Sequence, residues 1–214
     1  SAESEEVDAD NDGALIHVTG QMASSEELAD SVFSVNVSAI QLERQAEMYQ
    51  WEENKKTKTE KKVGGGEKKV TSYSYKKTWA STLNDSSNFK KQKDHVNPGQ
   101  MAYEGKTFVA KNVNLGKYEL SESLISQYTE WEDLSLNSDH LSKLSEDLQA
   151  SAKIAGGKVY IGPDPSSPSI GDMRISFRQV LPGTASVIAK QTGKQLHAYT
   201  TEVGTTLEML TAGT

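Results

Sequence analysis

The sequence contains no cysteine. This absence excludes disulfide bonds, thiolate catalysis and cysteine-based zinc sites, and it fits either a periplasm or a cytoplasm. Aromatic residues make up only 7% of the chain. No apolar run approaches the roughly 18 residues that a bilayer span requires, and no signal peptide opens the chain. The sequence itself therefore contains no predicted membrane span.

The two ends suggest where the chain comes from. It begins at Ser1 without an initiator methionine, and it stops soon after the apolar Leu207, Met209 and Leu210. We therefore expect an excised piece of a longer protein, cut at a membrane boundary.

The composition is polar for a globular domain. A chain of 214 residues can bury roughly 70% of its unfolded surface. The hydrophobic share is nevertheless 35%, with a mean hydropathy of −0.61, which favours a thin sheet-based core with extended appendages. The net charge is −7, and six acids lie in the first twelve residues. This charge argues against a nucleic-acid partner, which needs a positive face.

The clearest structural pattern is a long antiparallel hairpin. Apolar side chains alternate with polar ones before residue 50, and β-branched and aromatic residues repeat the pattern in Val70–Tyr75 and at Trp79. The connection from Lys55 to Lys69 holds seven lysines, two glutamates and three consecutive glycines, so we expect a mobile, projecting tip. The apolar positions on one side of the first strand are Ile40, Leu42, Ala46 and Met48.

The remainder predicts an α+β fold. We expect a strand at 14–19, one or two helical turns between Ser24 and Val32, short strands at 107–113 and 158–161, a short helix after Ser121 and a second helix at 139–150. Alternation in 173–178, 185–189 and 196–200 predicts a C-terminal three-stranded meander. The expected architecture is an antiparallel β platform, formed by 13–82 and 157–204, with a projecting hairpin and an inserted helical part.

Several motifs, in this order and spacing, resemble the LUMA family, also called transmembrane protein 43. They are Glu47–Glu52, Gly64–Gly66, Thr71–Tyr75 with Trp79, Ser86–Ser87 with Phe89, and His95–Pro98, with further likeness at 8–20 and 204–210. The likeness is weak between Pro98 and Ile170. The structural residues of this resemblance are Tyr49, Trp51, Tyr73, Tyr75, Trp79, His95, Asn97 and Pro98.

The resemblance implies a multi-span membrane protein whose large soluble segment lies between the first and second spans, on the extracytoplasmic side. That side would be the periplasm in a bacterium and the lumen of the endoplasmic reticulum or nuclear envelope in a eukaryote. Charge and residue patterning divide the chain into an acidic tail at 1–12 and a single domain at 13–204 with its helix-containing part at about 83–156. The resemblance adds a juxtamembrane segment at 205–214. It transfers no catalytic residue and no cofactor. The expected function is a non-enzymatic scaffold for membrane organisation or protein assembly.

The lysine-rich tip is the first candidate site. It could contact anionic lipid headgroups, or single-stranded nucleic acid with help from the nearby aromatics, or it could be a solvated tip whose charges prevent edge-to-edge pairing. We favour the solvated tip, followed by lipid or partner contact. The candidate residues are Lys55, Lys56, Lys58, Lys61, Lys62, Lys68 and Lys69.

The second candidate is a metal site. Asp8, Asp10 and Asp12 before Gly13 match the first half of a calcium loop, but the twelfth position is Thr19 rather than a bidentate glutamate. The four histidines show no metal-ligand spacing. We therefore interpret the three aspartates as an acidic tail that ends in a turn, and we expect no metal.

Asp94 and His95 are the most enzyme-like neighbours, because a carboxylate can orient an imidazole. Adjacent strand residues point in opposite directions, and no nucleophile motif accompanies them. We expect His95 to bond to the backbone of an Asn-Pro turn, and Trp51 and Trp79 to pack across strands. The alternative function is a ligand-binding or enzymatic domain whose site is assembled from residues far apart in the sequence.

The hairpin also bears on assembly. Its length would make it project, and its apolar face would need a cover from the helical part or from a neighbouring copy. We favour the neighbouring copy, and hence a homo-oligomer, with the membrane as a further partner through flanking spans.

Overall fold

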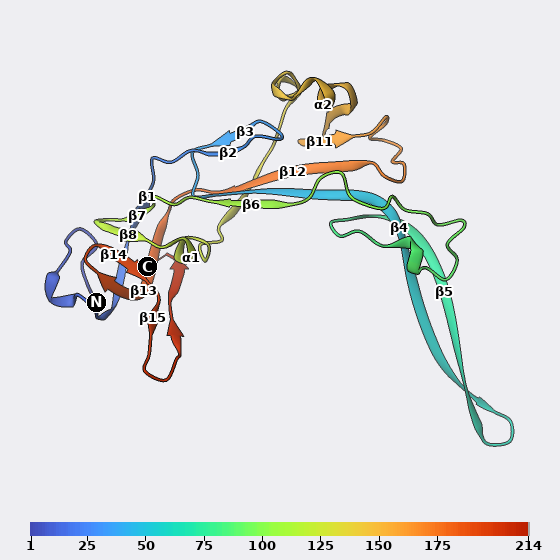
Figure 1. The fold of residues 1–214 in the computed structure, drawn as a ribbon, viewed down its shortest axis with the longest axis horizontal. Helices are drawn as coiled ribbons and strands as arrows, with labels where there is room; N and C mark the ends of the chain where they lie inside the picture. Colours follow the sequence, from blue (N-terminus) through green and yellow to red (C-terminus); the bar gives the residue numbers. More distant parts are fainter. Residues whose placement is uncertain (214) are drawn as a thin grey trace.

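The computed structural model describes residues 1–213. The chain is mostly β, with 48% of residues in strands, and the longest helices have six residues. It forms an arch in which a closed ring of strands at one end is joined by a long sheet to a projecting two-stranded arm at the other (Figure 1). The α+β class therefore overstates the helical content.

The ring is a small sheet that closes on itself. Its order is β1-β7-β8-β14-β13, and β13 returns to pair with β1. Alternate residues of β13, such as Ala185, Val187 and Ala189, are fully buried, so the period-2 pattern fills the interior. The strands are β1 (Leu15–Ala23), β7 (Asn114–Leu115), β8 (Tyr118–Leu120), β13 (Thr184–Thr192) and β14 (Gln195–His197), with β17 (Met209–Ala212) added to β13.

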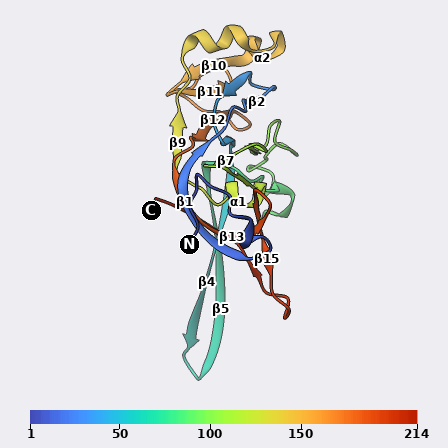
Figure 2. The same ribbon diagram turned by 90° about the vertical axis from the view of Figure 1, so that its left-hand side faces the viewer.

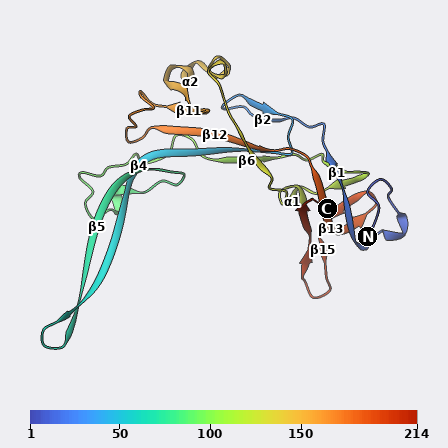
Figure 3. The same cartoon turned by 180° about the vertical axis from the view of Figure 1, so that it is seen from behind.

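The long sheet runs through the middle of the arch (Figures 1 and 3). Its order is β10-β11-β12-β4-β5, with β6 added to β4 and β9 added to β12. Residues 83–156 supply strands to both sheets. The strands of the long sheet are β4 (Gln41–Lys62), β5 (Gly66–Ala80), β6 (Lys106–Val109), β9 (Trp131–Leu134), β10 (Ala152–Ala155), β11 (Lys158–Ile161) and β12 (Met173–Val180).

Strand β4 is the spine of the molecule because it belongs to both the core and the arm. Residues 41–48 pair with β12, and residues 48–62 pair antiparallel with β5. Its side chains are mostly buried as far as Gln50 and exposed from Lys55 onward. The arm, which we define as residues 51–77, therefore grows out of the core without a break in the strand.

The remaining elements are short. Strands β2 (Leu28–Asp30) and β3 (Val35–Val37) form a hairpin on the side opposite the arm tip, and β15 (Tyr199–Thr200) and β16 (Thr206–Leu207) form another beside the ring (Figures 1 and 2). The helical segments are η1 (Ala9–Asn11), η2 (Ser86–Asn88), α1 (Glu122–Ile125), η3 (Ser138–Lys143) and α2 (Glu146–Ser151).

The acidic N-terminal segment packs on the ring. Ala2 forms a parallel bridge with Val18, and the Lys117 backbone N–H donates to the Ser4 carbonyl. Gly116 has a φ of 56°, and a Cβ there would collide with the Ser4 carbonyl oxygen. Glycine is therefore required at this close approach.

The predicted C-terminal meander is wrong, because β12 and β13 lie in different sheets. One edge of β12 is paired with β4, and its other edge is paired with β11 and β9. With both edges occupied, β12 has no edge for β13, which pairs with β1 instead. Only the β13–β14 pairing of the expected meander forms.

Two helix predictions also differ from the structure. The helix expected at 139–150 is divided into η3 and α2, because Leu144 is extended and Ser145 caps the second piece by accepting from the Leu148 N–H. The helical turns expected after Ser24 are absent. There, the Ser24 hydroxyl accepts from the Glu26 N–H in a turn, and strand β2 follows.

The apolar face of β4 is covered by this chain. Leu42, Ala46 and Met48 of β4, and Ile40 just before it, are all buried in one hydrophobic cluster that extends through both sheets. The projecting part of the arm is polar instead. The argument that this face needs a neighbouring copy therefore loses its basis, and self-association through another surface stays a proposal.

Candidate functional site

The candidate lysines lie along the distal half of the arm. Successive strand residues point to opposite faces, so the β4–β5 register places Lys56, Lys58, Lys62 and Lys68 on one face. Lys55, Lys61 and Lys69 lie on the other face. All seven side chains are exposed. Positive charge therefore surrounds the arm instead of forming a stripe on one side.

The charge of the chain is strongly divided. Residues 55–69 contain seven lysines and two glutamates, a net charge of +5. The whole chain carries −7, so the remaining residues carry −12. Glu60 faces Lys68 and Glu67 faces Lys61 across the two strands, which leaves most of the lysine charge unneutralised. The arm is thus the positive pole of an acidic protein.

The root of the arm is held by Asn97. Its side-chain oxygen accepts from the Trp51 N–H at 2.7 Å, and its amide nitrogen donates to the carbonyls of Trp51 and Asn84, both at 2.9 Å. Asn97 is buried. This one side chain therefore takes the place of a neighbouring strand at Trp51, on the edge that β12 leaves open.

Aromatic rings also pack at the root of the arm, where the loop after β5 meets Tyr75 of β5 and Trp51 of β4. The His95 ring stacks on Tyr75 with centroids 3.7 Å apart and meets the edge of Trp51 at 4.7 Å. His95 Nδ1 lies 2.7 Å from the Lys91 carbonyl, so this nitrogen donates to backbone as predicted from the sequence. Lys77 lies over the Trp51 ring at 5.1 Å. The loop after β5 thereby braces both strands of the arm.

The Glu53 carboxylate joins β4 to β5 and to the following loop at the root of the arm. The Tyr75 hydroxyl donates to Glu53 Oε2 at 2.6 Å, and the Lys90 N–H donates to the same oxygen at 2.6 Å. The hydrogen bond from Tyr75, followed by that from Lys90, lowers the pKa of Glu53 below its ordinary value. Desolvation and the bond to Glu53 raise the pKa of the Tyr75 hydroxyl. These groups hold the arm in place.

A second aromatic group lies where the arm meets the long sheet. The Trp79 ring is 5.2 Å from Tyr49 and 5.8 Å from Tyr160, and the Arg174 guanidinium lies over it at 4.5 Å. Trp79 and Tyr49 face each other across β4 and β5, which confirms cross-strand packing. Tyr73 lies opposite Lys55, closer to the tip.

The structure also reveals a buried pair that the sequence did not suggest. The Tyr160 hydroxyl donates to Asp172 Oδ2, and the Ser169 N–H donates to the same oxygen at 3.0 Å. Desolvation and this carboxylate raise the pKa of Tyr160 far above its ordinary value. The two residues are twelve positions apart in the chain, and no sequence motif predicts that they form a hydrogen bond. Pro98 lies close by, with its Cγ 3.3 Å from the position that a Cβ on Gly171 would take.

The three aspartates of the expected tail bond to backbone or point to solvent. The Asp8 carboxylate accepts from the Asp10 N–H at 2.9 Å and caps η1. The Asp12 carboxylate accepts from the Gly193 N–H at 2.7 Å and so ties the segment to the ring. Among residues 1–213, no three histidine, aspartate or glutamate side chains are grouped as metal ligands.

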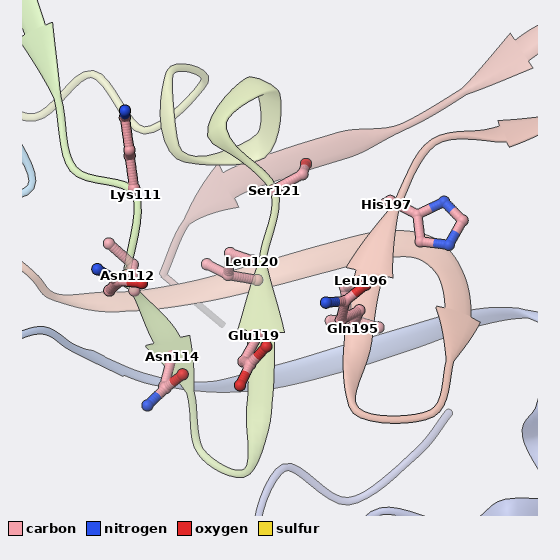
Figure 4. Close-up of a pocket in the computed structure, with 10 residues that line it drawn as sticks. Lys111, Asn112, Asn114, Glu119, Leu120, Ser121, Gln195, Leu196 and His197 are labelled. Carbon is pink, nitrogen blue, oxygen red and sulfur yellow. The ribbon is translucent and has the colours of Figure 1, made fainter.

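The ring has a surface hollow of about 470 Å³ beside β8 and β14 (Figure 4). Its labelled side chains include Lys111, Glu119 and His197, and they point in different directions rather than toward a common centre. His197 Nε2 bonds to the Thr192 hydroxyl at 2.7 Å, and the Lys194 ammonium lowers the pKa of Glu119. His197 and Glu119 are thus paired with neighbours, so the hollow is a weak candidate compared with the arm.

The helices of this chain are short. Within residues 1–213, none has the length and hydrophobicity that crossing a bilayer requires.

Known proteins place the chain in a family. A family model described as Transmembrane protein 43 matches residues 48–214. Transmembrane protein 43 of Homo sapiens is 36% identical over 214 residues, and that of Rattus norvegicus is 36% identical over 216 residues; both alignments cover 95% of this chain and 52% of the relative. The Drosophila melanogaster homolog is 27% identical, covering 94% and 52%. No solved structure matches. The chain spans about half the length of these relatives, and it belongs to the transmembrane protein 43 family.

Proposed function

We propose that this chain is the extracytoplasmic domain of a multi-span membrane protein and that it acts there as a non-enzymatic scaffold for protein assembly. Family membership supports the association with a membrane. The observation that carries the scaffold role is the continuous spine β4, which joins the ring end of the arch to the arm over 22 residues. A scaffold needs contact surfaces held at a fixed separation, and one strand shared by core and arm provides that.

Pairs of side chains stiffen the spine on its solvent side. Arg174 and Arg178 of β12 bond to Glu47 and Glu43 of β4 at distances of 2.6 to 2.8 Å. Arg178 also lies over the Trp131 ring, as Arg174 lies over Trp79. In the core, buried Arg44 pairs with fully buried Asp30 at 2.8 Å. These contacts resist bending between the ring and the arm.

Assembly can be tested in the whole protein. In a shortened-arm variant, residues 57–71 are replaced by Asn-Gly, which closes a tight hairpin. We expect the wild-type protein to run as assemblies larger than one chain in detergent mass photometry, and the shortened-arm variant to form smaller ones. Assemblies of equal size in both proteins would contradict the scaffold role of the arm.

Sidedness can be tested separately by glycosylation. Asn36-Val37-Ser38 and Asn84-Asp85-Ser86 are acceptor sequences for N-linked glycans. The whole protein translated with microsomes should gain mass that endoglycosidase removes, and Asn36→Gln combined with Asn84→Gln should abolish the gain. An unmodified wild-type protein would argue for the cytoplasmic side.

A further inference from the structure

Two hairpins project from the same side of the arch. One is the arm, and the other is the β15–β16 hairpin with its turn at residues 201–205. Figures 1 and 3 show both extending in the same direction from opposite ends of the molecule, and Figure 2 shows the same when it is viewed end-on. The β2–β3 hairpin and α2 lie on the opposite side. The molecule therefore has one face that would meet a flat surface at two separated points.

Each projecting turn carries an exposed valine. Val63 at the arm tip is fully exposed, and Val203 in the β15–β16 turn is 88% exposed. Leu207 and Met209, which follow the second turn, are also exposed. Isolated exposed apolar residues are common on proteins. Here they lie at the two points that extend farthest on one side, and one of them is adjacent to the lysine cluster.

The charge distribution indicates what kind of surface would be met. The segment at 55–69 carries a net charge of +5 with lysines on both faces, whereas the rest of the chain carries −12. An anionic surface attracts the arm and repels the acidic remainder, which orients the molecule with the arm tip toward that surface. The β15–β16 turn contains Glu202 and no lysine, so its contribution would be apolar contact only.

We propose that the arm binds the headgroups of an anionic lipid bilayer through Lys55, Lys56, Lys58, Lys61, Lys62, Lys68 and Lys69, with Val63 entering the interface and Val203 making the second contact. An anionic membrane surface attracts lysine side chains over about a Debye length. An apolar side chain strengthens binding further when it is buried at the boundary between headgroups and acyl chains. This deepens the proposed function, on whose membrane association it rests, by naming lipid as the partner of the arm.

The charge contribution can be tested with the chain itself and vesicles. We expect residues 1–214 to co-float with phosphatidylcholine vesicles that contain 30 mol% phosphatidylserine, and not with phosphatidylcholine alone. Each lysine near the surface contributes about fivefold in affinity, so the triple variant Lys58→Glu, Lys62→Glu, Lys68→Glu should bind about a hundredfold more weakly or not at all. Raising the salt to about 0.5 M should release the wild-type chain.

A matched control separates location from net charge. The triple variant Lys111→Glu, Lys117→Glu, Lys143→Glu changes the net charge equally, at exposed positions outside the arm. It should bind vesicles within about threefold of the wild type if the arm is the contact. Equal losses in the two triple variants would overturn the proposal, because general charge rather than the arm would then drive binding.

Insertion of the tip can be followed by fluorescence. Val63→Trp should show a blue-shifted emission when anionic vesicles are added, because tryptophan prefers the membrane interface. Val32→Trp is the control, since Val32 is also exposed but lies in the β2–β3 turn on the opposite side. A shift in neither variant, or the same shift in both, would contradict insertion at residue 63.

The source of the anionic charge is distinguished in the same assay. Binding of inorganic phosphate at millimolar concentration, with no vesicle binding at physiological salt, would overturn a lipid surface in favour of a free anion. Binding to polyglutamate but not to vesicles would overturn it in favour of an acidic protein. These results do not depend on sidedness or on assembly size. The lipid proposal can therefore fail while the scaffold function is supported, and the scaffold function can fail while lipid binding is observed.

Discussion

At the scale of single residues, Asn97 is a loop residue whose side chain holds the edge of strand β4. Its amide reproduces the donor and acceptor of a neighbouring strand, and it satisfies both backbone groups of Trp51 while it is buried. A shorter side chain at this position would leave these backbone groups without partners away from water.

We expect Asn97→Ala to lower the free energy of unfolding by about 2 to 3 kcal/mol, since buried groups lose hydrogen bonds that water cannot replace. Urea denaturation followed by tryptophan fluorescence measures this. Asn114→Ala, at an exposed position of β7, is the control and should change stability by less than about 0.5 kcal/mol. Similar losses in both variants would show that Asn97 has no special role.

Glu53 predicts a dependence on pH. Its pKa is lowered because the Tyr75 hydroxyl and the Lys90 N–H bond to the ionised carboxylate. A carboxyl whose pKa is lowered by folding stabilises the protein fully at pH values above its ordinary pKa, which is near 4.5. This contribution disappears as the pH falls through the lower pKa of the folded state. Stability should therefore decline on acidification below about pH 5.

Glu53→Gln should flatten that decline, and Tyr75→Phe should flatten it in part, because Tyr75 is the largest cause of the lowered pKa. Urea midpoints measured between about pH 3 and pH 7 provide the comparison. If all three proteins lose stability with the same slope, the Glu53 interaction is unimportant for acid stability.

At the scale of elements, the arm combines two different environments along one hairpin. The root is packed against the loop at 84–98 and against Tyr160, whereas the side chains from Lys55 to Lys69 contact mainly solvent. A two-stranded ribbon without a packed face contributes little to stability. The distal arm is therefore available for binding and not needed for folding.

Replacing residues 57–71 by Asn-Gly should change the free energy of unfolding by less than about 1 kcal/mol, as measured by urea denaturation. Trp79→Ala at the root is the contrasting variant, since Trp79 contacts Tyr49, Tyr160 and Arg174. Its loss should cost about 3 kcal/mol. A shortened arm as unstable as Trp79→Ala would mean that the distal ribbon supports the core.

At the scale of the whole molecule, the two poles of charge have different structural settings. The acidic N-terminal segment is bound to the ring through Ala2, Tyr118 and Gln191, while the basic segment is held away from the core at the end of the arm. The Tyr118 hydroxyl donates to the Glu6 carbonyl, and Gln191 donates to that of Asp8. The separation limits neutralisation of one pole by the other within one copy.

We expect millimolar calcium to leave the melting temperature unchanged within about one degree, because a ligand that binds only the native state must stabilise it. The carboxylates of Asp8 and Asp12 accept backbone N–H groups in place of a cation. A clear calcium-dependent rise in differential scanning fluorimetry, abolished by Asp10→Asn, would contradict this account.

Local pattern was sufficient to predict the long strands in which apolar and polar residues alternate, but not short strands such as β2, where helical turns were expected. Alternation in β4, β12 and β13 follows from the pleat of a single strand, and the polarity of Lys55–Lys69 follows from side chains that cannot be buried. The family resemblance likewise depends on the order of motifs along the chain. Neighbours in sequence encode these properties, so the amino-acid sequence by itself determines them.

Long-range pairing decided the rest. The edges of β12 are taken by β4, β9 and β11, so β13 joins β1 and closes a ring that no local pattern indicates. Asp172 meets Tyr160, and the β15–β16 hairpin projects on the same side as the arm, only after the chain folds. Such contacts depend on which strand edges remain open and on the direction in which β4 leaves the core. Both are properties of the assembled sheets and not of any segment alone.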